Sequence, residues 1–224
     1  MEFDKDLTAR QEARELARRA ETAQRKLAEL SQSQLDAIVE AVAKAFAAQA
    51  SALAEMAVQE TGFGNAEDKR AKNLFASQRV AEAVRGMKTV GLLREVPEKK
   101  LWEIGVPVGV IAAIVPSTNP TSTVCYKAMI ALKSGNAIVF SPHPKAIACT
   151  RKATQIVSEA AQAAGAPADA VACLSIPSLD GCQELMKAEP VRLILATGGP
   201  GMVKAAYGAL GVLGIPWTAW ITFL

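Results

Sequence analysis

Four short apolar runs, separated by helical stretches, constrain the fold of this sequence more than any other feature. The runs are VGVIAAIVP (108–116), AIVFS (137–141), AVACLS (170–175) and RLILAT (192–197). Continuous apolar runs of this length are typical of strands that are buried on both faces of a parallel sheet. The stretches between them, 122–133, 146–164 and 180–188, have helical patterns. The alternation predicts an α/β fold, in which right-handed βαβ units form a doubly wound, mostly parallel sheet.

The first half of the sequence indicates helices followed by a hairpin. The stretches 6–30, 35–60 and 66–87 predict scaffold helices. Ser31 with Gln34 has the pattern of a capping box, and Asn65 can cap the third helix. From Gly91 apolar and polar residues alternate around PEK, which predicts a hairpin, either an ordinary edge hairpin or one that reaches a neighbouring subunit. We therefore divide the chain into N-terminal helices over 1–90, a hairpin over 91–107 with a possible role in oligomerisation, a Rossmann-like core over 108–207 and an atypical tail over 208–224.

Composition excludes several functional classes. The 25 Lys and Arg residues are nearly balanced by 22 Asp and Glu residues, so the basic surface of a nucleic-acid-binding protein is not expected. There is one histidine, and no C-x-x-C pair occurs, so neither a metal site nor a disulfide framework is expected. The charged N-terminus lacks the apolar segment of a secretory signal. We expect a cytoplasmic protein with small-molecule partners and no membrane association.

The loops after the predicted strands carry the candidate functional residues, because ligands of such sheets bind beyond the carboxyl ends of the strands. In TGGPG, Thr197, Gly198 and Gly199 precede a helix, where backbone N–H groups can bind a diphosphate; a plain tight turn is the alternative. His143 in SPHP is a candidate for catalysis, for ligand contact or for an ordinary surface position. In PSTNPTS, Asn119 can donate from its amide to an oxyanion, or it can form an Asx turn or cap the next helix.

The segment EIGVPVGVIAAIVPSTNPTSTVCYKAMIALKSGNAIVFSPHPKA, with LILATGGPGMVKAAY further on, resembles the CoA-acylating branch of the aldehyde dehydrogenase superfamily. The resemblance extends from the N-terminal helices to about Tyr207. It implies that Asn119 stabilises the thiohemiacetal oxyanion. It also implies three groups of contacts with NAD or NADP: Pro116, Ser117 and Thr118 at the nicotinamide, Ser141, His143 and Pro144 at the adenosine end, and Thr197, Gly198 and Gly199 at the pyrophosphate.

Two positions favour the acylating branch over the hydrolytic aldehyde dehydrogenases. The hydrolytic enzymes usually have an aromatic residue before the Asn and a Lys at the end of the next strand, whereas Thr118 and Ser141 occupy these places here. The implied reaction is attack of a Cys thiolate on an aldehyde, hydride transfer to NAD(P)+ and release of the acyl group to coenzyme A, and it also runs in reverse. The resemblance further implies a homo-oligomer for the full-length protein. Neither the aldehyde nor the choice between NAD and NADP follows from the sequence.

In this family the nucleophilic Cys lies several tens of residues beyond the pyrophosphate turn, in a separate catalytic domain, and 25 residues follow Gly199 here. We therefore expect a C-terminally truncated member without the catalytic domain, inactive alone and marginally stable. The four cysteines, Cys125, Cys149, Cys173 and Cys182, are expected to be core residues. The uncharged tail after Lys204 favours a frameshift or a mispredicted gene end, with a membrane-embedded helix as the alternative. Two other functions stay open: a non-catalytic dinucleotide-binding or subunit-interaction module, that is, a pseudoenzyme, and a relative that reduces acyl phosphates.

Overall fold

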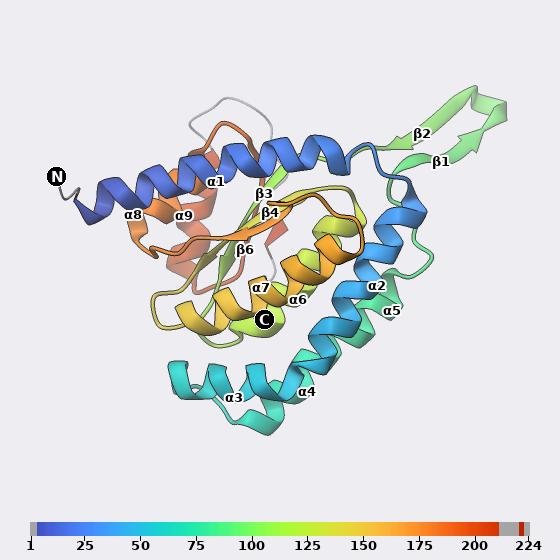
Figure 1. Ribbon diagram of the computed structural model, residues 1–224. Coiled ribbons are helices and arrows are strands. Elements are labelled where there is room, and N and C mark those ends of the chain that lie inside the picture. The colour runs from blue at the N-terminus through green and yellow to red at the C-terminus, as the bar shows by residue number, and fades with distance from the viewer. Residues whose placement is uncertain (1–3, 211–219, 222–224) are drawn as a thin grey trace.

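The computed structural model describes residues 4–210 and 220–221 of the chain. Five described strands form one sheet in the order β5-β4-β3-β6-β7, and all neighbouring strands are parallel. The strands are β3 (Val110–Val115), β4 (Ala137–Pro142), β5 (Val171–Cys173), β6 (Val191–Ala196) and β7 (Trp220–Ile221). The chain begins the sheet at β3, adds β4 and β5 on one side, and returns to add β6 and β7 on the other. This order confirms the predicted doubly wound α/β fold (Figure 1).

The central strands are continuous apolar runs because helices cover both faces of the sheet. Every residue of β3 and of β4 is buried. Figure 1 shows α1 (Lys5–Leu27) above the sheet, and α6 (Pro120–Lys133) and α7 (Ile147–Ala163) below it. The helix α8 (Leu179–Lys187) packs against α1, and α2 (Gln32–Ala48) packs on α6 and α7. The described core is therefore a sheet between two helical layers.

The long helix α1 approaches the sheet through small side chains. Its buried positions are spaced by three or four residues, so they share one face of the helix. Most of them are alanines, which allow a helix to lie close to the strands: Ala9, Ala13, Ala17, Ala20 and Ala23. α1 ends at Leu27, three residues before the predicted end at Leu30. The predicted capping box of α2 forms next, because Ser31 and Gln34 each accept a hydrogen bond from the other's backbone N–H.

The predicted helix over 35–60 is wrong in one respect, because the chain bends within it. It forms two helices, α2 and α3 (Ala50–Thr61), whose axes meet at 64° around Gln49. The Asn73 amide donates to the carbonyl of Ala50 at the start of α3, a contact between segments that are distant in sequence. The bend allows both helices to bury an apolar face.

The predicted helix over 66–87 is also interrupted. It forms α4 (Ala66–Leu74), a π-helical turn over Phe75–Arg79, and α5 (Val80–Val84). Within the turn, the Ser77 hydroxyl bonds the carbonyls of Asn73 and Leu74. Side-chain bonds of this kind compete with the regular helical ladder. The predicted cap at Asn65 is confirmed, because its side chain accepts from the Asp68 N–H at 2.9 Å.

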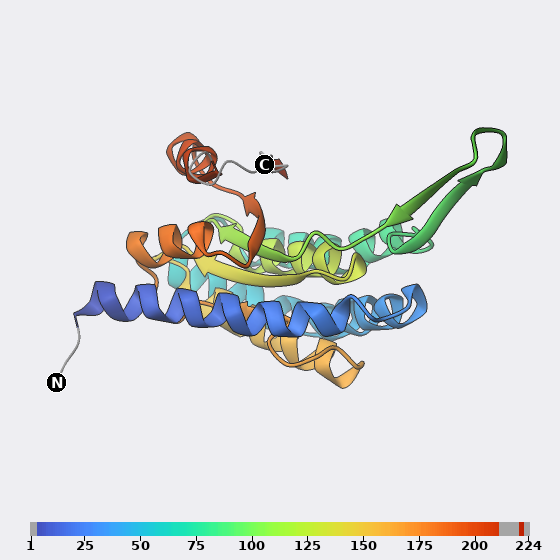
Figure 2. The ribbon, with the colours of Figure 1, turned by 90° about the horizontal axis from the view of Figure 1, so that it is seen from above.

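The hairpin stands away from the body of the molecule (Figure 2). β1 (Gly91–Val96) and β2 (Leu101–Gly105) pair antiparallel, and a 3-10 turn over Pro97–Lys99 joins them. Large apolar side chains on and just after β2 are exposed: Trp102, Ile104, Val106 and Val108. β3 then starts at Val110 rather than at Val108, because Gly109 has a φ of 130° that a regular strand does not adopt.

The tail predicted to be atypical, 208–224, lies largely outside the described residues. The helix α9 (Pro200–Leu210) continues three residues beyond Tyr207, where the core was expected to end, and the short β7 pairs with β6. Most of the segment to which the frameshift and membrane-helix interpretations refer is therefore not described. Among the described residues, no single helix is long and apolar enough to cross a bilayer, and the bent pair α2 and α3 meets these criteria only as a pair.

Candidate functional site

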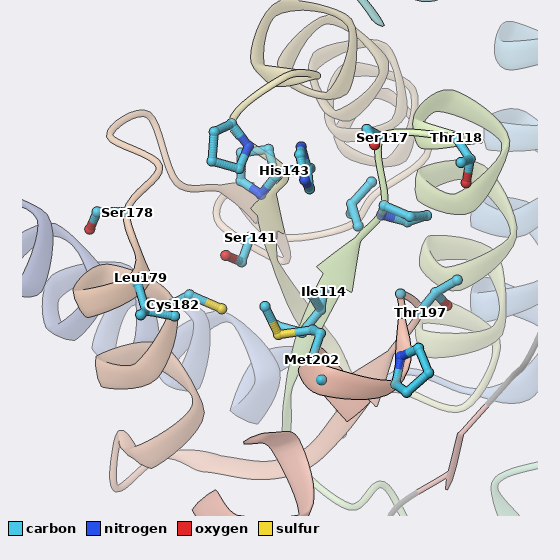
Figure 3. A pocket seen from close by; sticks show the side chains of 18 residues that line it. Ile114, Ser117, Thr118, Ser141, His143, Ser178, Leu179, Cys182, Thr197 and Met202 are labelled. Atoms are coloured by element: carbon cyan, nitrogen blue, oxygen red, sulfur yellow. The ribbon is translucent and has the colours of Figure 1, made fainter. Parts of the chain in front are cut away.

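A cavity of about 660 Å³ opens at the carboxyl ends of β3, β4 and β6. The strand order reverses at β3, and in open α/β sheets ligands bind beside such a switch point. Three loops supply most of the wall: 114–118 at the end of β3, 141–144 at the end of β4 and 197–202 after β6 (Figure 3). Ser178, Leu179 and Cys182, at the start of α8, complete it. Its volume lies within the range of roughly 300–1,000 Å³ that small-molecule sites have.

The structure brings nine of the ten site residues expected from the sequence together in this cavity. They come from the three strand-end loops and are Pro116, Ser117, Thr118, Ser141, His143, Pro144, Thr197, Gly198 and Gly199. The tenth, Asn119, follows Thr118 directly and does not belong to the cavity wall. Residues up to 83 positions apart meet because parallel strands end at the same edge of the sheet.

The turn after β6 leaves its backbone open to the cavity. A Cβ at Gly199 or Gly201 would meet no other heavy atom within 4 Å, and one at Gly198 would touch only the Met202 side chain, at 3.5 Å. Nothing in the described protein fills this space. The turn leads directly into α9, whose first N–H groups and helix dipole favour an anion. This arrangement fits a phosphate group.

The end of β4 offers neutral side chains. Ser141 is buried, and both Ser141 and Cys182 border the cavity. His143 is exposed, and its Nδ1 accepts from the backbone N–H of Lys145 at 3.1 Å. A hydrogen bond to a backbone N–H orients the ring without activating it, and no carboxylate bonds the imidazole within the described residues. Ligand contact therefore suits His143 better than general acid–base catalysis.

The helix α6 joins the ends of β3 and β6 beside the cavity. The Lys127 side chain is 1% exposed, and its Nζ donates to the carbonyls of Ile114 at 2.9 Å and Leu195 at 2.7 Å. Burial lowers the pKa of Lys127 from 10.5 to about 7. The hydroxyls of Tyr126 and Thr197 lie 3.3 Å apart. α6 thus fixes the two strand ends from which two walls of the cavity begin.

Asn119 does not act as a helix cap. It precedes α6, but its side chain makes no capping hydrogen bond, and its Oδ1 accepts instead from Lys72 Nζ at 3.2 Å. The carbonyl of Thr118 accepts from Lys69 Nζ at 2.6 Å. Burial, together with the Lys72 charge, lowers the pKa of Lys69. The cap role left open by the sequence is therefore wrong, and two lysines of α4 are added to the surroundings of Asn119.

On the α8 side of the cavity, the sequence indicated the strand-end loop SIPS (175–178), but no single residue there was named as a candidate. The Ser178 hydroxyl caps α8 by accepting from the Gly181 N–H at 2.9 Å, and Leu179 is 63% exposed at the cavity edge. Cys182 is buried, as expected of a core residue, yet it also borders the cavity. SIPS was expected at this edge because it follows a predicted strand, as the other three loops do; Leu179 and Cys182 lie just after it and have no pattern that marks them as cavity residues.

The environments of the four cysteines disfavour the thiolate. All four are free; Cys125, Cys149 and Cys182 are buried, and Cys173 is partly exposed. Burial raises the pKa of each thiol, to about 12 for Cys149 and for Cys173. Because the thiolate is the nucleophile, these thiols are poor nucleophiles. In the described part of the chain, no group of three or more His, Cys, Asp and Glu side chains could hold a metal ion.

Comparison with known proteins identifies the family. Residues 5–212 match the family described as aldehyde dehydrogenase. The chain belongs to the aldehyde dehydrogenase family. The bifunctional aldehyde-alcohol dehydrogenase AdhE of Escherichia coli is 48% identical over 194 residues, which make up 87% of this chain and 22% of AdhE.

Solved structures of relatives agree with this assignment. An acetylating aldehyde dehydrogenase from Geobacillus thermoglucosidasius is 51% identical with a TM-score of 0.92, and the match covers 97% of this chain and 47% of that one. An engineered glycolyl-CoA reductase with bound NADP+ is 30% identical with a TM-score of 0.74. The match covers 88% of this chain and 44% of the reductase chain. The expected resemblance to the CoA-acylating branch is confirmed. The chain spans less than half the length of each of these relatives.

Proposed function

We propose that this chain binds NAD+ or NADP+ as the cofactor-binding part of an oxidoreductase that interconverts an aldehyde and its acyl-CoA. The cavity at the switch point carries the proposal, because three loops that are distant in sequence converge there. Membership of the aldehyde dehydrogenase family supports the reaction class. The bound NADP+ in the glycolyl-CoA reductase supports the class of ligand.

The residues of the cavity fit a dinucleotide in three parts. The open turn at Gly198 and Gly199, before the N-terminus of α9, would hold the pyrophosphate. The other two loops would border the rings: Pro116, Ser117 and Thr118 at the nicotinamide, and Ser141, His143 and Pro144 at the adenosine. In doubly wound folds a carboxylate after the second strand binds the ribose, or an Arg binds the 2′-phosphate. Neither follows β4 here, so both NAD+ and NADP+ are candidates.

The chemistry divides between the cofactor and the protein. Bound NAD(P)+ would accept a hydride from the substrate. The Asn119 amide would donate a hydrogen bond to the oxyanion that forms when a thiolate attacks the aldehyde, and coenzyme A would receive the acyl group as co-substrate. We assign the thiolate to none of the four cysteines of this chain, because burial raises the pKa of each.

The same burial favours a second candidate function, a non-catalytic dinucleotide-binding or subunit-interaction module. Both functions use the same cavity. In the oxidoreductase a protein segment outside this chain supplies the thiolate, and in the non-catalytic module no thiolate is supplied. The exposed apolar side chains Trp102, Ile104 and Val106 of the hairpin support the proposal that the hairpin contacts another subunit in a homo-oligomer. We also propose a cytoplasmic location, because all four cysteines are free, as is usual in a reducing compartment.

A thermal-shift titration with NAD+, NADP+ and coenzyme A tests the proposal. A ligand that binds only the folded state at 100 times its Kd stabilises that state by about 2.7 kcal/mol. For a chain of this size, that corresponds to a rise in Tm of roughly 5–10 °C. We expect this rise with NAD+ or NADP+.

Two glycine variants show whether the rise comes from the cavity. Gly198→Val is expected to abolish it, because the added Cβ makes only an ordinary contact with Met202 and the rest of the side chain enters the cavity. Gly208→Val on α9, where a Cβ also meets nothing within 4 Å, is the matched control and should keep the rise. No rise with either dinucleotide, or an equal rise in the Gly198→Val variant, would contradict the proposal.

A further inference from the structure

One face of α4 holds the loop between β3 and α6. Lys69, Lys72 and Asn73 are spaced i, i+3 and i+4, which places them side by side on a helix. We call these three residues the α4 bracket. Two of them bond the loop and the third bonds the first turn of α6: Lys69 Nζ donates to the Thr118 carbonyl at 2.6 Å, Lys72 Nζ donates to Asn119 Oδ1 at 3.2 Å, and Asn73 Oδ1 accepts from the Thr121 hydroxyl of α6 at 2.8 Å.

Two members of the α4 bracket are buried, whereas the bond between Lys72 and Asn119 lies at the surface. Lys69 is 5% exposed and Asn73 is fully buried. Asn73 uses both ends of its amide, because its Nδ2 also donates to the Ala50 carbonyl at 3.0 Å. Buried polar groups of this kind are costly unless they are hydrogen-bonded. Lys69 therefore fixes the loop backbone at Thr118, Asn73 fixes the start of α6 at Thr121, and Lys72 bonds the Asn119 side chain between these two points.

The chemistry of lysine decides which way the Asn119 amide faces. An ammonium group has three donors and no acceptor, so the amide atom that it bonds must be the carbonyl oxygen Oδ1. The opposite orientation would place the amide N–H groups against the ammonium. The contact with Lys72 therefore leaves both hydrogens of Asn119 Nδ2 available for another acceptor.

We propose that Lys72 is a positioning residue, which orients the Asn119 amide so that Nδ2 is presented to an oxyanion. The ammonium also polarises the amide through Oδ1, which makes the Nδ2 hydrogens stronger donors. This role rests on the proposed function, in which Asn119 is the oxyanion donor. Lys72 itself touches neither substrate nor cofactor in this account.

The test measures the Asn119 side chain directly by NMR on the whole chain labelled with 15N. The Nδ2 resonance is assigned by its loss in Asn119→Ala. In the wild type we expect a high order parameter for Nδ2, close to the value of about 0.85 that rigid backbone has, and in Lys72→Met a value below about 0.6 together with a shifted resonance. Lys72→Arg, which keeps a donor-only cation, is expected to restore both.

Controls separate positioning from a general effect on the fold. Lys72 is exposed, so Lys72→Met should leave the Tm and the other backbone resonances nearly unchanged. Lys44→Met, which removes an exposed lysine on α2, should leave the Asn119 resonance unchanged. An Asn119 amide that is equally ordered in the wild type and in Lys72→Met, or that Lys72→Arg fails to restore, would overturn the role of Lys72.

This readout requires neither cofactor nor turnover. If NAD(P)+ fails to bind while the Asn119 amide loses order in Lys72→Met, the proposed function fails and the orienting contact stands. If NAD(P)+ binds and the order parameter of the Asn119 amide is the same in the wild type and in Lys72→Met, the positioning role fails and the proposed function stands.

Discussion

The buried Lys127 makes the stability of the fold depend on pH in a predictable direction. Burial lowers its pKa from 10.5 to about 7 in the folded chain, and unfolding returns the side chain to water. Between these two values, the unfolded chain therefore holds a proton that the folded chain has released. Stability rises with pH wherever the unfolded state binds more protons. The free energy of unfolding should accordingly increase as the pH rises through this window.

The size of the effect follows from the two pKa values. One proton of difference changes the free energy of unfolding by about 1.4 kcal/mol per pH unit. Near pH 7 the folded Lys127 is half deprotonated, and near pH 9 it is almost fully deprotonated, so the contribution over this interval is about 2 kcal/mol. The cysteines act in the opposite direction, because burial raises their pKa values and the unfolded chain ionises them first. A comparison of variants is needed to isolate the lysine.

Lys127→Met isolates it, because methionine keeps much of the aliphatic side chain and does not titrate. The variant also loses the two hydrogen bonds to the Ile114 and Leu195 carbonyls. This loss lowers its free energy of unfolding by an amount that changes little with pH. The assay is urea unfolding followed by circular dichroism, in reducing buffer, at about pH 7, 8 and 9. The free energy of unfolding of the wild type minus that of the variant should increase by about 2 kcal/mol over this range.

Lys44→Met provides the matched control, because Lys44 is an exposed lysine on α2. The free energy of unfolding of Lys44→Met should differ from that of the wild type by the same amount at all three pH values. Parallel curves for the wild type and Lys127→Met would show instead that the ammonium of Lys127 is not desolvated in the folded chain.

Two further predictions concern a helix start and the hairpin. Glu60 accepts from the backbone N–H groups of Ala148 at 2.7 Å and Cys149 at 2.8 Å at the start of α7, so Glu60→Gln should lower the free energy of unfolding by about 1 kcal/mol at neutral pH. Burial acts to raise the pKa of Glu60, but the hydrogen bonds from Cys149 and Ala148 outweigh it, and the pKa is lowered. The difference between wild type and variant in urea midpoint should therefore disappear as the pH falls through this lowered pKa; a constant difference would argue against the ion–N–H contact. Trp102→Lys on the exposed hairpin should shift any oligomer towards the monomer in sedimentation velocity, and an unchanged distribution of species would exclude this hairpin as the contact.

The sheet and most of its ligand-binding edge could be predicted from the sequence, because both depend on local patterns. β3 and β4 are buried on both faces and therefore appear as continuous apolar runs. Since parallel strands end at one edge, the loops that contain Pro116, Ser141 and Thr197 had to meet there. Nine of the ten expected residues line one cavity for this reason.

The features that were not predicted depend on contacts between distant segments. The break between α2 and α3 involves Asn73, 23 residues beyond Ala50. Lys127 has no pattern that distinguishes it from an exposed lysine on a helix, and its burial becomes visible only when the carbonyls of β3 and β6 are side by side. Lys72 bonds Asn119 across 47 positions, so the spacing of the α4 bracket had no evident partner in the sequence.

We propose that the cavity between the ends of β3, β4 and β6 holds a dinucleotide. A crystal structure of the chain grown with saturating NAD+ or NADP+ tests it most directly. We expect the pyrophosphate at Gly198 and Gly199, one ring beside Pro116 and the other beside His143. A dinucleotide bound at another surface, or an empty cavity at a cofactor concentration that saturates the thermal shift, would contradict the account.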